Sequence, residues 1–158
     1  MFLFQHKAVR WDDTIELRLS GRDETDEENG IRFSVVFDIC LRRSHRAIGY
    51  ISFRYGESPL LYYLGHVGYR INEKYRGHGY ARAACVLLGD YLSGQGITSA
   101  VITTDDTNMA SRKTCENLGC VPERKAPVPL KFRSACQGSR CKYRYIWMIR
   151  DQDGHFDQ

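Results

Sequence analysis

The first half of the chain consists of short runs in which apolar residues either alternate with polar ones or form apolar blocks. Alternation over residues 14–20 predicts a strand. The runs 31–41 and 47–55 are rich in Val, Ile, Phe and Tyr, and the charged turn between them predicts a hairpin. A fourth strand is expected over residues 60–71, just before a glycine-rich turn.

The second half changes to helical periodicity. Over residues 80–93, apolar side chains recur every three or four positions, which predicts a helix with one apolar face. The elements expected after it are a strand over 100–103, a helix over 108–118, a strand at 120–121, a loop over 122–142 and a last strand over 143–150. The order β-β-β-β-α-β-α-β-β is typical of a mixed α/β fold, here a single domain over residues 1–158.

Composition supports a folded, water-exposed domain. The chain has 158 residues, the size of one domain, and 42% of them are hydrophobic and 27% charged. With 7 Phe, 10 Tyr and 2 Trp, it is too aromatic to be disordered throughout. No apolar run is long enough to predict a membrane helix, and the first residues become charged too early for a secretory signal. A cytoplasmic protein without membrane contacts is therefore expected.

Cysteine spacing predicts neither a disulfide framework nor a metal site. There is no C-x-x-C pair, and Cys136 and Cys141 have no matching pair of histidines, so no metal is expected. Without an export signal, the cysteines are expected to be reduced thiols that mostly serve packing. They are Cys40, Cys85, Cys115, Cys120, Cys136 and Cys141.

Charge is distributed unevenly along the chain, although the net charge is only +4. Residues 1–30 carry 4 Lys/Arg and 8 Asp/Glu, with most of the acids in the run DETDEE at 23–28. Residues 121–150 carry 8 Lys/Arg and 1 Asp/Glu. The basic segment could be a solvated strand edge or a surface for an anionic ligand, and the acidic run could attract a cationic one. No nucleic-acid-binding motif is present, so nucleic acid is an unlikely partner.

The segment 69–81, YRINEKYRGHGYA, leads from a strand through a glycine turn directly into the predicted helix. Gly77 and Gly79 allow a ligand to approach the backbone closely, and the first N–H groups of a helix have no partner within it. A phosphate or diphosphate fits such a site, and Arg76 adds a cation. Neither the Walker pattern nor G-x-G-x-x-G is present, which disfavours both of those nucleotide folds.

Three segments together resemble the GNAT acetyltransferases. R-G-H-G-Y-A at 76–81 is similar to the family signature R/Q-x-x-G-x-G/A, and G-Y-R-I at 68–71 resembles the family's fourth strand. N-M-A-S-R-K-T-C-E-N-L-G-C at 108–120 is similar to the second coenzyme segment, N-x-x-S/A-x-x-x-Y-x-x-x-G-F, with Asn108 and Ser111 in register. The resemblance covers residues 31–150.

This resemblance implies a GNAT-like fold, with a central, twisted, mostly antiparallel sheet and flanking helices, and acetyl-CoA as co-substrate. In the family, backbone amides of the turn hold the coenzyme's diphosphate, and the strand before it pairs with the pantetheine arm. The cofactor-binding residues that follow are Tyr69, Arg70, Ile71, Arg76, Gly77, His78, Gly79, Tyr80, Ala81 and Asn108.

The chain departs from the family between its first two predicted strands. The family usually places two helices there, beside the acceptor groove, whereas only residues 21–30 are available here. Either those helices are missing or the strand at 14–20 is misassigned. If they are missing, the acceptor side is unusually open or is completed by another subunit, which makes a homodimer plausible.

Two residues are candidates for acid–base catalysis. His66 stands where related enzymes often have Glu, and an imidazole suits a general base at neutral pH. Cys115 occupies the place of the family's frequent tyrosine acid, and a thiol could protonate the departing thiolate. Alternatively Cys115 only packs, and either water, Tyr143 or Tyr145 supplies the proton or no acid is needed.

The sequence therefore predicts an acyltransferase that moves acetyl from acetyl-CoA directly to a primary amine in a ternary complex. The acceptor is a small molecule or a peptide. Two other functions stay open: a non-catalytic acyl-CoA-binding module, because the tyrosine acid and the acceptor-side helices are missing, and a nucleic-acid binder that uses the basic segment 121–150.

Overall fold

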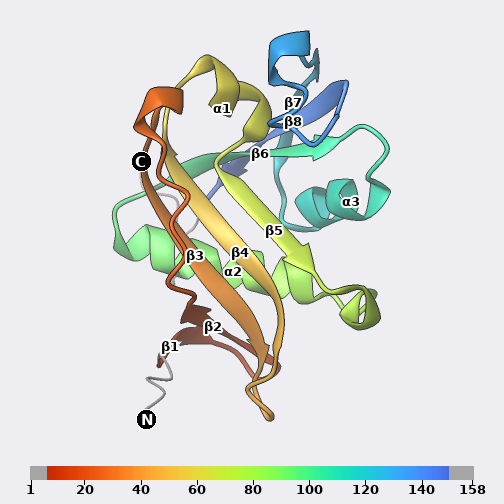
Figure 1. Cartoon of the computed structure of the whole chain (residues 1–158). Helices are drawn as coiled ribbons and strands as arrows, with labels where there is room; N and C mark the ends of the chain where they lie inside the picture. Colours follow the sequence, from red (N-terminus) through yellow and green to blue (C-terminus); the bar gives the residue numbers. More distant parts are fainter. Residues whose placement is uncertain (1–6, 150–158) are drawn as a thin grey trace.

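Eight strands form one sheet in the computed structural model, which describes residues 7–149 (Figure 1). Their order across the sheet is β1-β2-β3-β4-β5-β6-β8-β7, and all neighbours are antiparallel except β5 and β6. This mixed, mostly antiparallel sheet confirms the predicted fold class. The strands are β1 Ala8–Trp11, β2 Ile15–Leu19, β3 Ile31–Leu41, β4 Ala47–Gly56, β5 Val67–Ile71, β6 Ser99–Asp105, β7 Val121–Pro127 and β8 Cys141–Met148.

Two helices, α2 (Tyr80–Gly94) and α3 (Met109–Asn117), cover one face of the sheet (Figure 1). Alternate residues of the strands point to this face, so that Phe37 and Ile51 pack in one cluster with Leu88 of α2. Burial of a side chain of this size stabilises the fold by about 1.5–3 kcal/mol. Within residues 7–149 no helix has both the length and the apolarity that a membrane crossing requires.

The predicted fourth strand over 60–71 is wrong in its first half, which is the helix α1 (Pro59–Leu64). Ser58 caps this helix by accepting a hydrogen bond from Leu61 N at 3.1 Å, and Pro59 follows the cap directly. Gly65 ends the helix with a positive φ of 78°. The strand therefore starts only at Val67, and α1 lies on the face opposite α2, where Thr103 Oγ1 donates to the Leu64 carbonyl at 3.0 Å.

The two edge strands of the sheet differ from the sequence prediction. β1 was not predicted; it precedes the first predicted strand and pairs with β2. β7 begins at the strand predicted for residues 120–121 but does not end at Pro122: it continues into the predicted loop as far as Pro127 and pairs with β8. A proline is tolerated there because β7 is an edge strand, with one side free of a partner strand. The short helix η3 (Leu130–Phe132) then leads back to β8.

Residues 21–30 connect β2 to β3 and are all described in the structure. Their helical content is the three-residue η1 (Glu27–Asn29), so the two helices usual in the family are missing here. The strand predicted at 14–20 is confirmed as β2. Of the two explanations for the short connection, the missing helices are therefore correct and the misassigned strand is wrong. The segment 21–30, hereafter the acidic loop, runs over the face of the sheet opposite α2, alongside β3 and β4 (Figure 1).

Candidate functional site

The neighbouring strands β5 and β6 separate soon after they meet (Figure 1). Among the described residues their ladder contains a single pair, Val67 with Ile102. On its other side β5 pairs with β4, where Asn72 N donates to Ile48 O at 2.7 Å. Main-chain N–H and C=O groups of successive residues point to opposite sides of a strand. The N–H and C=O groups of Tyr69 and Ile71 therefore point towards the gap between β5 and β6. The gap thus exposes strand backbone in the middle of the sheet.

The glycine turn lies at the end of this gap and leads into α2. Arg76 Nε donates to Ile71 O at 2.8 Å and so joins the turn to the strand. Gly77 and Gly79 have φ values of 85° and 76°, and a Cβ built at either would meet no described atom within 4 Å. Gly79 is the N-cap of α2, and no described side chain caps this end. The amides at the start of the helix are therefore free to bind an anion.

Asn108 begins α3 beside the same region. Its Oδ1 accepts a hydrogen bond from Ser111 N at 3.0 Å, which is a standard N-cap. The Ser111 hydroxyl in turn lies 2.7 Å from the Tyr69 hydroxyl, and burial raises the pKa of this tyrosine. The structure therefore brings Tyr69 and Asn108, predicted from separate segments, to one place.

His66 is enclosed between strands, with both ring nitrogens bonded. Nδ1 accepts a hydrogen bond from Val101 N at 3.0 Å, so the ring proton is on Nε2, which lies 3.2 Å from Gly56 O. Burial lowers the pKa of His66 and favours the neutral ring. This geometry gives His66 a clear structural role, and a base role would require one of the two bonds to open.

Cys115 lies on the buried side of α3 and exposes no surface. A hydrogen bond with Cys120 and burial both raise the pKa of the Cys115 thiol, so it stays protonated. Tyr145 is also buried, with its hydroxyl 3.4 Å from Arg112 Nε, and Tyr143 lies under the same guanidinium at 4.1 Å. All six cysteines are free thiols, as predicted.

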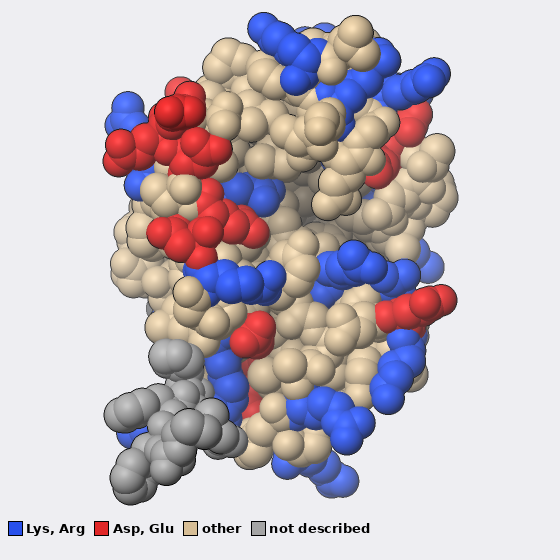
Figure 2. Space-filling model, viewed as in Figure 1, with Lys and Arg blue, Asp and Glu red and all other residues tan. Residues whose placement is uncertain are grey.

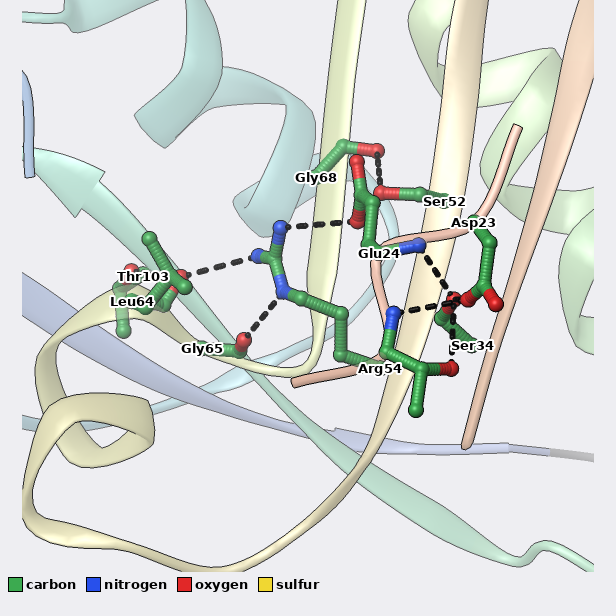
Figure 3. Close-up of polar contacts among 10 residues, drawn as sticks. Asp23, Glu24, Ser34, Ser52, Arg54, Leu64, Gly65, Gly68 and Thr103 are labelled. Atoms are coloured by element: carbon green, nitrogen blue, oxygen red, sulfur yellow. Dashed lines mark hydrogen bonds and ion pairs between the residues drawn. The ribbon is translucent and has the colours of Figure 1, made fainter. Parts of the chain in front are cut away.

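Arg54 is a polar centre of this region that the sequence analysis missed. It lies on β4, is only 9% exposed, and donates from Nε to Gly65 O at 3.1 Å and from Nη2 to Leu64 O at 3.2 Å (Figure 3). Its Nη1 pairs with Glu24 Oε2 of the acidic loop at 3.3 Å. An arginine within the apolar run AIGYISFRY was the available signal, because a buried cation needs partners.

The basic segment is partly neutralised by the fold. Lys142 pairs with Asp105 at 2.9 Å, and Arg144 pairs with Glu123 at 2.9 Å. Two further cations of this segment, Arg124 and Lys131, border a groove of about 650 Å³ between α1 and β7, which also contains Tyr62, Tyr63 and Phe132. Figure 2 shows this face of the molecule hollowed near its centre, with a group of acidic side chains on one side of the hollow.

Comparison with solved structures shows the same fold. A ribosomal-protein-S5-alanine acetyltransferase from Vibrio fischeri matches with a TM-score of 0.59 and 22% identity, over 77% of this chain and 64% of that chain. A RimL ribosomal L7/L12 alpha-N-protein acetyltransferase in complex with coenzyme A matches with a TM-score of 0.65 and 16% identity, over 90% and 98%. The microcin C7 self immunity acetyltransferase MccE, in complex with acetyl-CoA and AMP, matches with a TM-score of 0.54 and 19% identity, over 78% and 63%.

This chain spans only 64% of the length of the Vibrio fischeri enzyme, and 66% of the length of a further solved relative, an acetyltransferase of the GNAT family from Bacillus anthracis. No curated protein matches the sequence. The family model described as "Acetyltransferase (GNAT) domain" matches residues 5–121, which include the separated strands, the glycine turn and the first helix after it. The chain therefore belongs to the GNAT acetyltransferase family.

Proposed function

We propose that the chain binds acetyl-CoA in the gap between β5 and β6 and transfers the acetyl group to a primary amine. The observation that carries this proposal is the position of the free strand backbone directly beside the uncapped start of α2. One extended ligand with a diphosphate and an amide-containing arm can bind both features. Two solved relatives hold acetyl-CoA or coenzyme A, which supports this choice of ligand.

In the proposed complex, the diphosphate lies on the amides of residues 77–81, where the α2 dipole is positive. Arg76, fixed by its bond to Ile71 O, adds a positive charge at the edge of the turn. Tyr69 and Ile71 bond to the pantetheine arm, and a main-chain N–H of this strand stabilises the oxyanion that forms on the thioester carbonyl. Asn108 acts through α3, which it caps.

The transfer itself needs a neutral amine. An alkyl amine with a pKa of about 10.4 is almost fully protonated at neutral pH, so one proton must leave before attack. The nitrogen then attacks the thioester carbon and gives its second proton to water, the C–S bond breaks, and the coenzyme thiolate takes a proton from water. Several solved relatives are named as ribosomal-protein alanine, alpha-N or serine acetyltransferases, so peptides with a free N-terminal amine are the first acceptors to test.

The substitution Gly79→Glu tests the coenzyme site. A carboxylate at the start of α2 blocks access to the amides and repels the diphosphate, and we expect no measurable coenzyme A binding in a calorimetric titration. Gly96→Glu is the matched control, because Gly96 also has a positive φ (78°) and open space but lies at the far end of α2. Unchanged affinity of the Gly79 variant would contradict the assignment.

A non-catalytic acyl-CoA-binding module is the second candidate. It is favoured by one observation, namely that His66 and Cys115 are both engaged or buried. Consumption of acetyl-CoA with a panel of peptides, a lysine derivative, a polyamine and an aminoglycoside distinguishes the two functions. Coenzyme binding without turnover of any of these amines would support the module.

A further inference from the structure

The acidic loop is fixed to the sheet by hydrogen bonds at its start. Ser34 Oγ on β3 donates to Asp23 Oδ1 at 2.8 Å and accepts from Glu24 N at 2.7 Å, while Thr25 N donates to Asp23 Oδ1 at 2.7 Å (Figure 3). Hydrogen bonds from the side chain and backbone of Thr25 and from Ser34 lower the pKa of Asp23, which therefore stays ionised. The loop thus has a defined position on the face opposite α2, even though it lacks helices.

This anchoring places the Glu24 carboxylate beside β5, the strand proposed to bind the coenzyme. Glu24 Oε2 lies 3.3 Å from Arg54 Nη1, and a Cβ built on Gly68 would lie only 3.1 Å from the same nitrogen. One guanidinium therefore separates Glu24 from the residue that precedes Tyr69. Figure 3 shows the carboxylate, Arg54, Ser52 and Gly68 grouped together on this face of the sheet.

Charge and exposure make Glu24 suitable for binding a cation. The Glu24 side chain is 31% exposed. The Arg54 side chain is only 10% exposed and is also bonded to two carbonyls at the end of α1. Arg54 orients the carboxylate without covering it. The acidic loop carries five carboxylates and a single Arg22, so the field around Glu24 remains negative. Figure 2 shows acidic side chains on this side of the hollow.

We propose that Glu24 binds the ammonium group of the acceptor and receives its proton, so that the acceptor is a cationic primary amine. This inference rests on the proposed acetyltransferase function. The ammonium donates a hydrogen bond to Glu24, its proton passes to the carboxylate and then to solvent, and the neutral nitrogen attacks the thioester carbon. The carboxylate missing from the strand at position 66 is thereby supplied by the acidic loop.

The substitution Glu24→Gln tests this role with little change in shape. The amide oxygen of glutamine can still accept from Arg54, so the loop stays in place while the negative charge is lost. With a pentapeptide that begins with a free alanine amine, we expect KM for the peptide to rise about 10-fold or more, as for a lost charged hydrogen bond. The coenzyme dissociation constant is expected to stay unchanged, whereas the melting temperature should fall, because the buried Arg54 loses its counter-charge.

Glu28→Gln is the matched control, because Glu28 is an exposed acid of the same loop and makes the same change in net charge. It is expected to behave like the unmodified chain. An unchanged peptide KM in the Glu24 variant would overturn the inference, and so would an equal rise in both variants. If the unmodified chain binds no coenzyme A or acetylates no amine of the panel, the proposed function itself fails.

Discussion

At the scale of single residues, long-range partners decide what a side chain does. His66 has the chemistry of a base, but its ring lies between Val101 N and Gly56 O, which belong to different strands. Arg54 would be an unfavourable charge in an apolar strand, but two carbonyls and Glu24 satisfy its guanidinium, although burial lowers its pKa. Neither set of partners can be derived from the residue type alone.

The substitution His66→Ala is expected to lower stability more than catalysis. It leaves Val101 N and Gly56 O without their partner, and because both groups are only partly buried the cost is about 1 kcal/mol, the lower end of the range for buried groups. Urea unfolding measures this loss, and the pH profile of kcat/KM for the remaining folded enzyme should keep its shape. Loss of the acidic limb of that profile would instead support His66 as the general base.

The pH dependence of this contribution has a defined sign. Burial lowers the pKa of His66 below its ordinary value of about 6.5, so the unfolded chain takes up the proton first. The stabilisation is therefore complete above about pH 6.5 and decreases as the pH falls towards the folded-state pKa. The difference in unfolding free energy between the unmodified chain and His66→Ala should shrink over the same range.

At the scale of elements, close approach of α2 to the sheet depends on a glycine. A Cβ built on Gly89 would lie 3.0 Å from Trp147 Cζ2 of β8, whereas one built on Gly94 in the same helix meets Arg10 Nη2 at an ordinary 3.6 Å. An alanine side chain would therefore fit at Gly94 but would be crowded at Gly89 of the same helix.

Gly89→Ala is expected to destabilise the fold by about 1–3 kcal/mol through overpacking against Trp147. Gly94→Ala should be neutral or stabilising by up to about 1 kcal/mol, because alanine favours the helix. Thermal unfolding of the two variants under the same conditions measures the difference. Equal stability of both would show that α2 can move away from β8 at no cost.

Local signals allowed much of the fold, and the coenzyme part of the candidate site, to be predicted. The glycine turn, the periodicity of α2 and the Asn108 cap are all encoded within a few neighbouring residues. Helix α1 was missed because its six residues are too few to show a period, although Ser58, Pro59 and Gly65 marked its ends. The Glu24–Arg54 pair joins residues 30 positions apart, so no local pattern could reveal it.

At the scale of the whole molecule, the fold separates the charges that the sequence keeps in different segments. The acidic loop lies alongside β3 and β4, while the cations Arg124 and Lys131 border the groove beside α1 (Figure 2). Lys142 and Arg144 are already paired within the sheet, so only part of the basic segment acts on solvent. We therefore expect a cationic acceptor to be attracted towards the acidic loop.

Acetylation of a cationic peptide is accordingly expected to depend on salt. At saturating acetyl-CoA, a rise from about 50 to 500 mM NaCl should increase the peptide KM several-fold and leave kcat nearly constant, because salt screens exposed charges. Initial rates over a peptide series measure the effect. A salt-independent KM would mean that the acidic loop does not attract the acceptor.

Arg54 joins both sides of the proposed acceptor site, since one guanidinium binds the end of α1 and the loop that carries Glu24. Neither the acidic loop nor α1 can be replaced alone by the corresponding segment of a relative, because the replacement would leave the buried Arg54 without part of its partners. Redesign of this protein for a new amine would therefore have to replace the loop, the short helix and position 54 as one unit.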